Sequence, residues 1–129
     1  MIWGVALREV LSDYAKAEYS WGKTDCIQFI SSYVAKRTGI NHASRFEYDS
    51  EFSALKLMSR HGGIEGLIES CLGDSKPGAK PGDVVVCHSE NLHIPGVYNG
   101  SYAWAFTEKG LGRLLLQSVV CAWDSCPRQ

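Results

Sequence analysis

Cys26 is the residue of this sequence with the clearest chemical potential, because its neighbours fit the start of a helix. Asp25 can act as the N-cap, and Gln28, three positions later, fits a variant of the capping box. A thiol attacks a carbonyl only as thiolate, and the N–H groups and dipole of a helix N-terminus favour that anion. The same N–H groups can hold a developing oxyanion. Cys26 is therefore a candidate nucleophile, although a first-turn cysteine is more often a small buried apolar side chain.

A nucleophilic thiol needs a general base, and the candidates are His93 and His88. Pro95 follows closely after His93, and proline in a strand marks an edge or a bulge that can re-aim a neighbouring side chain. His88 follows a valine-rich run that ends at Cys87. We expect His93 to act as the base, with His88 as the alternative; a structural or surface role is open for both.

The other cysteines do not form a familiar framework. An odd total of five, with no C-x-x-C pair, predicts neither a set of disulfides nor a zinc ribbon. Cys87, His88 and His93 match no usual zinc spacing, so we expect no metal and no cofactor. Cys121 and Cys126 could pair, or join Cys87 around a cluster, but ordinary thiols are the simpler interpretation for them and for Cys71.

The elements that must position these residues fall into two halves. Apolar residues at helical spacing predict helices in the first half and period-two patterns predict strands in the second. The expected helices cover residues 3–18, residues 26–38 before Gly39, and two short segments within 52–72 that are divided by His61-Gly62-Gly63 and closed by Gly73. The expected strands are Asp83 to Cys87, Ile94 to Tyr98, Tyr102 to Phe106 and Leu114 to Gln117, with turns at Asn99-Gly100 and Gly110-Leu111-Gly112 and an irregular loop over residues 40–50.

This order predicts an α+β fold, with helices first and antiparallel strands second. The length of 129 residues suits a single domain, with a helical part over about 1–73 and a strand-rich part over about 82–125. Thirteen basic against fourteen acidic residues give a net charge of −1, which argues against nucleic acid as a partner. The sequence shows no secretory signal pattern and no apolar run of ~18 residues, so we expect no membrane span.

Three segments resemble the NlpC-type cell-wall cysteine peptidases, which are papain-like in fold. The segment Tyr19-Ser20-Trp21-Gly22-Lys23-Thr24-Asp25-Cys26 resembles the family's nucleophile segment. Lys80-Pro81-Gly82-Asp83-Val84-Val85-Val86 resembles the entry to its first strand, and Gly96-Val97-Tyr98-Asn99-Gly100 resembles the end of its histidine strand. The order of these segments implies a papain-like domain whose central helix begins at Cys26.

A compact phage and prophage branch of this superfamily, associated with tail tips, is more similar still. Its pattern W-G-x-x-D-C-x-x-F is met by Trp21, Gly22, Asp25, Cys26 and Phe29; Gly62-Gly63 and Ala122-Trp123 match two further elements. The resemblance implies a chain made in the bacterial host cytoplasm and assembled into a phage tail. Its implied partners are peptidoglycan stem peptides and tail-tip proteins.

The resemblance also defines where this chain departs from the pattern. The family's base lies two residues before the glycine matched by Gly96, a position held here by Ile94, and a one-residue slip to His93 reverses the strand face. In the family, the residue that orients the imidazole lies on the next strand, but Tyr102 to Phe106 contains no His, Asn or Gln. The candidates to replace it are Thr107 and Asn99, neither at the family's position, and a backbone carbonyl. Tyr19 is implied to lie near the reacting carbonyl, with helix-end packing as its alternative.

Two functions follow as expectations. The first is a tail-tip cysteine peptidase or amidase, in which Cys26 attacks an amide of peptidoglycan and His93 transfers the proton to the leaving amine. The second is a structural or assembly component of the tail tip that has kept the fold without the activity. An intracellular amidase or acyltransferase on the same scaffold is a third interpretation, because fold does not fix substrate.

Overall fold

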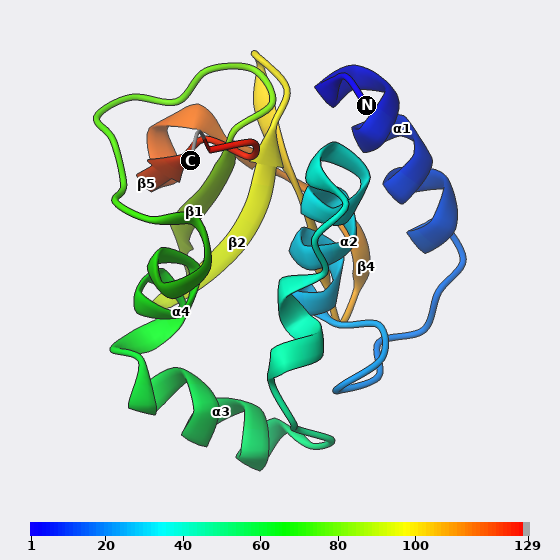
Figure 1. The fold of residues 1–129 in the computed structure, drawn as a ribbon, viewed down its shortest axis with the longest axis vertical. Helices are drawn as coiled ribbons and strands as arrows, with labels where there is room; N and C mark the ends of the chain where they lie inside the picture. Colours follow the sequence, from blue (N-terminus) through cyan, green and yellow to red (C-terminus); the bar gives the residue numbers. More distant parts are fainter. Residues whose placement is uncertain (128–129) are drawn as a thin grey trace.

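The computed structural model describes residues 1–127 and contains helices in its first half and an antiparallel sheet in its second (Figure 1). The described chain is therefore α+β. The α-helices are α1 (Trp3–Tyr14), α2 (Cys26–Thr38), α3 (Glu51–Arg60) and α4 (Gly63–Leu72), and the short 3-10 turns are η1 (His42–Arg45) and η2 (Leu116–Ser118). The strands are β1 (Val84–Ser89), β2 (Leu92–Tyr98), β3 (Tyr102–Thr107), β4 (Gly110–Leu115) and β5 (Val119–Trp123).

The five strands form one sheet in the order β4-β3-β2-β1-β5. Successive hairpins place β1 to β4 side by side, and the chain then crosses through η2 to add β5 beside β1 at the opposite edge. One face packs against α1, α2 and α4, and α2 lies across the middle of the sheet in Figure 1. The other face carries a smaller apolar cluster of Val85, Cys87, Tyr98, Ala103 and Ala122.

The central helix α2 begins and ends where its sequence predicts. The Asp25 side chain accepts the N–H of Gln28, and Gly39 closes the helix with a φ of 84°, donating its own N–H to the Ala35 carbonyl. Ile27, Phe29 and further apolar residues of α2 are buried against the sheet and the neighbouring helices.

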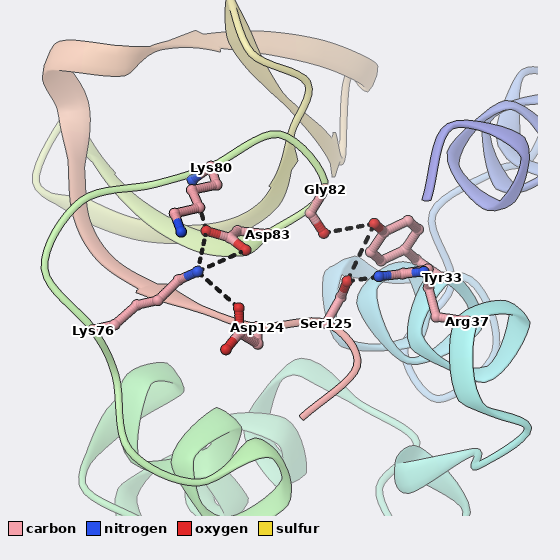
Figure 2. A network of polar contacts seen from close by, with 8 residues as sticks. All are labelled: Tyr33, Arg37, Lys76, Lys80, Gly82, Asp83, Asp124 and Ser125. Atoms are coloured by element: carbon pink, nitrogen blue, oxygen red, sulfur yellow. Dashed lines mark hydrogen bonds and ion pairs between the residues drawn. The ribbon is translucent and has the colours of Figure 1, made fainter. Parts of the chain in front are cut away.

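Two polar networks attach the connector before β1 to its surroundings (Figure 2). Asp83 is only 5% exposed, and its carboxylate accepts from the Lys80 N–H at 2.7 Å and from the Lys76 ammonium at 3.0 Å. Lys76 also contacts Asp124 at 2.8 Å, at the end of β5. The Pro-Gly-Asp segment is thereby fixed at the point where β1 begins.

The second network joins α2 to the residues just before β1 and just after β5, which lie at the same end of the sheet (Figure 2). The buried Tyr33 hydroxyl donates to the Gly82 carbonyl at 2.6 Å and lies 3.4 Å from the Ser125 hydroxyl. Arg37 donates to the same Ser125 oxygen at 3.1 Å. Gly82 itself has a φ of 93°, and a Cβ there would collide with the ring of Trp3. These contacts fix the position of α2 relative to the start of β1 and the end of β5.

The structure corrects three expectations about the elements and adds a strand. The first helix ends at Tyr14, because Ala17 and Tyr19 turn back to pack on the core. Gly110-Leu111-Gly112 is not a turn but the start of β4, which ends at Leu115. Residues 116–117, predicted as strand, lie in η2. The fifth strand was not predicted, because Val119–Trp123 lacks a period-two pattern.

Candidate functional site

The site around Cys26 is built by a tight loop before α2. Ser20 and Thr24 form an isolated antiparallel bridge, which folds the chain so that Gly22 comes back to Asp25. Gly22 has a φ of 88°, and a Cβ there would collide with the carbonyl of Tyr48. The Gly and the Asp of the Trp-Gly-x-x-Asp-Cys pattern thus each have a structural reason.

Asp25 is completely buried and fully hydrogen-bonded. One carboxylate oxygen accepts the Gly22 N–H at 2.8 Å, and the other accepts the Gln28 N–H at 2.8 Å and the Tyr48 hydroxyl at 3.0 Å. The Gln28 amide also reaches the Tyr48 oxygen, at 3.3 Å, instead of returning to the cap. The cap therefore forms, but the reciprocal half of the predicted capping-box variant does not.

Cys26 is the first residue of α2, and its environment is aromatic and acidic. Its N–H donates to the Tyr19 hydroxyl at 3.3 Å, and the Tyr19 ring is stacked on Phe106 with centroids 5.5 Å apart. Burial raises the pKa of the Cys26 thiol to about 11; the Asp25 charge also raises it, and the Tyr19 hydroxyl only partly offsets these effects. Desolvation therefore outweighs the favourable helix terminus and favours the protonated thiol.

The candidate bases lie at the turn end of the β1–β2 hairpin. His93, on β2, has its Nδ1 atom 2.8 Å from a carboxylate oxygen of Glu65 on α4, and its ring faces His88 at a centroid distance of 5.2 Å. Within residues 1–127, no hydrogen bond joins either imidazole to Cys26.

The pairing of β1 with β2 is continuous, so no bulge forms at Pro95. His93 lies on the same strand face as Pro95 and Val97, the face that the helices cover, and Ile94 lies on the opposite face.

The predicted orienting residues are engaged in turns. The Asn99 side-chain oxygen accepts the N–H groups of Ser101 and Tyr102, both at 2.9 Å. The Thr107 hydroxyl donates to the Gly110 carbonyl and accepts the Lys109 N–H, both at 3.2 Å. Both side chains therefore stabilise the hairpins that flank β3.

The remaining thiols are separate from each other. All five cysteines are free thiols. Cys87 is buried on the sheet face opposite to His88 and His93, so these three residues do not converge. The Cys71 sulfur accepts from Arg45 at 2.9 Å. Across residues 1–127, no group of three or more His, Cys, Asp or Glu residues could hold a metal ion.

Two residues of the site were missed at the level of sequence. Tyr48 comes from the loop over residues 40–50, which has no periodic pattern. Glu65 is one of several glutamates at polar positions of the predicted helices, and nothing in the sequence distinguishes it from the others. A buried aspartate at a helix start needs additional donors, and that requirement was the one available signal for a residue such as Tyr48.

The fold and the site define a small α+β domain with a cysteine at the capped start of its central helix. A family model described as "Domain of unknown function (DUF6950)" matches residues 1–125, and the chain belongs to this family. No curated protein and no solved structure matches the chain. None of the helices described between residues 1 and 127 is long and apolar enough to cross a membrane.

Proposed function

We propose that this chain is a non-hydrolytic structural or assembly component of a phage tail tip, built on a papain-like NlpC-type fold. The observation that carries the proposal is the set of hydrogen bonds around the two residues that catalysis would need. The N–H of Cys26 donates to the Tyr19 hydroxyl at 3.3 Å, and the ring of His93, the expected base, contacts Glu65 at 2.8 Å. A thiol with no base beside it packs as a small apolar side chain, and burial raises its pKa.

The electrostatics around the thiol oppose activation. Asp25 adds a negative charge next to Cys26, and a cysteine nucleophile needs a cation or a base in the same place. His93, the expected base, is paired with Glu65 at the surface.

The donors that an oxyanion would use are also occupied. The Cys26 N–H donates to Tyr19, and the Gln28 N–H donates to Asp25. A tetrahedral intermediate would have to displace these internal acceptors, which removes the preorganisation on which such stabilisation depends.

The tail tip as the place of action rests on the sequence resemblance. The segments that carry it have structural roles here: Gly22 allows the approach of Tyr48, and Asp83 fixes the entry to β1. A chain that has these structural residues but no activated thiol fits a structural or assembly role, which needs the fold and not catalysis.

The position of Cys26 favours a second candidate, a tail-tip cysteine peptidase or amidase acting on peptidoglycan stem peptides. Cys26 is the first residue of α2, where the helix dipole favours an anion. This function requires His93 to leave Glu65 and approach the thiol.

Two assays separate the candidates. We expect purified protein to release no stem-peptide fragments from peptidoglycan, and phage carrying Cys26→Ala to remain infectious while deletion of the chain gives defective particles. Cys71→Ala is the matched control for loss of a thiol. Fragment release that Cys26→Ala abolishes, with Cys71→Ala active, contradicts the proposal and supports the peptidase.

A further inference from the structure

His88 and His93 face each other at the end of the β1–β2 hairpin that Glu90 and Asn91 close. These two loop residues have φ values of 51° and 65°, as a two-residue hairpin turn with a fixed register requires. The register pairs His88 directly with His93. Both side chains lie on one face of the sheet, and both residues are exposed.

Hydrogen-bonded and non-hydrogen-bonded residue pairs alternate along antiparallel strands, and this alternation brings the two histidines close together. Pro95 has no N–H, so Val86 and Pro95 cannot exchange two backbone hydrogen bonds and form a non-hydrogen-bonded pair. Two residues further along each strand, His88 and His93 have the same pairing type, in which opposite Cα atoms are only about 4.5 Å apart.

The separation of the two rings matches that of two imidazoles on one ion. With metal–nitrogen bonds of about 2.0–2.1 Å, a ring radius of about 1.1 Å and a tetrahedral angle, the centroids lie about 5 Å apart. The observed centroid distance is 5.2 Å, with an interplanar angle of 79°. No large movement of the strands is needed to bring both rings onto an ion.

Glu65 prepares one of the two rings for this role. Its carboxylate accepts a hydrogen bond from Nδ1 of His93 at 2.8 Å, which leaves Nε2 as the ring nitrogen available to a metal ion. Metal-binding histidines commonly have such a carboxylate partner on the second ring nitrogen. Glu65 and Glu69 also raise the pKa of Cys121 on β5, so the carboxylates of α4 give this end of the sheet a potential that favours cations.

We propose that His88 and His93 bind one late first-row divalent metal ion, of the Cu²⁺, Ni²⁺ or Zn²⁺ class, with Glu65 as a positioning residue. Imidazole nitrogens suit these metals. The described residues supply two ligands rather than a set of three, so water completes the coordination. The site is independent of the state of Cys26.

The test is a titration of ¹⁵N-labelled protein with Ni²⁺ at pH 7.5, followed by paramagnetic broadening and equilibrium dialysis. We expect one Ni²⁺ per chain, with the first broadened amide signals around residues 88 and 93. His88→Ala and His93→Ala should each raise the half-saturating concentration at least tenfold, and Glu65→Gln should raise it several-fold. The two other histidines of the chain give matched controls, His42→Ala and His61→Ala, which should leave binding unchanged.

A second measurement uses the unaltered chain and does not depend on whether the variants fold. Bound Ni²⁺ should protect His88 and His93 from diethylpyrocarbonate, and leave modification of His42 unchanged. Unchanged binding in His88→Ala, first broadening beside a cysteine, or no protection by Ni²⁺ overturns the proposal.

Discussion

Replacing Asp25 tests how the start of α2 is held together. Asp25 is completely buried, and its carboxylate accepts from Gly22, Gln28 and Tyr48. Asp25→Ala removes an N-cap worth about 1 kcal/mol. It also leaves the Gly22 N–H and the Tyr48 hydroxyl without their acceptor, at a cost of about 1 kcal/mol each after partial hydration. We therefore expect a loss of about 3 kcal/mol in the free energy of unfolding.

The assay for this prediction is urea denaturation followed by tryptophan fluorescence and circular dichroism, with the slope of the transition compared between variants. Asp25→Asn is the matched control, because its remaining carbonyl oxygen can keep the helix cap; we expect it to lose only about 1–2 kcal/mol. Removal of the negative charge should also lower the pKa of Cys26, since Asp25 raises it. A change below 1 kcal/mol in Asp25→Ala would refute the reasoning.

Three further predictions concern pH, backbone and charge. The folded chain holds the Cys26 proton more tightly than the unfolded chain, because the pKa rises from 9.0 to about 11. The free energy of unfolding should therefore fall as pH rises from 9 to 11. In urea titrations, Cys26→Ser should lose about 2 kcal/mol less than the unaltered chain across this range. Gly22→Ala should cost more than about 2 kcal/mol by thermal unfolding, through positive φ and collision with Tyr48, whereas Gly112→Ala, with open space, should cost little. Lys76→Met should cost about 1–3 kcal/mol at pH 7 in urea denaturation, because it removes a charged partner from buried Asp83.

The two ends of α2 were predictable because the residues that determine them are close in the sequence. Asp25 precedes the apolar residues of the helix and caps its start, and Gly39 follows them and ends it, as the structure shows. The alternation of Tyr102, Trp104 and Phe106 with alanines likewise identified β3. In each case a short segment contains the whole signal.

The parts that were not predicted depend on distant partners. Tyr48 joins the Asp25 cap from 23 positions away, and nothing in its own neighbourhood marks that contact. The position of His93 depends on the pairing of β1 with β2 and on Glu65 from α4. β4 begins with a glycine that has a φ of 96°, so its sequence is typical of a turn although its backbone pairs with β3.

The most direct test of the central claim, that Cys26 is a protonated thiol without a base, is its alkylation rate as a function of pH. Trypsin releases Cys26 in the peptide of residues 24–36 and Cys71 in a different peptide, so mass spectrometry can follow iodoacetamide at both sites in the native protein. We predict that Cys26 reacts slowly at pH 7, that its rate rises toward an apparent pKa near 11, and that His93→Ala leaves the profile unchanged. A reactive thiolate with an inflection at or below pH 7, lost in His93→Ala, would contradict the account.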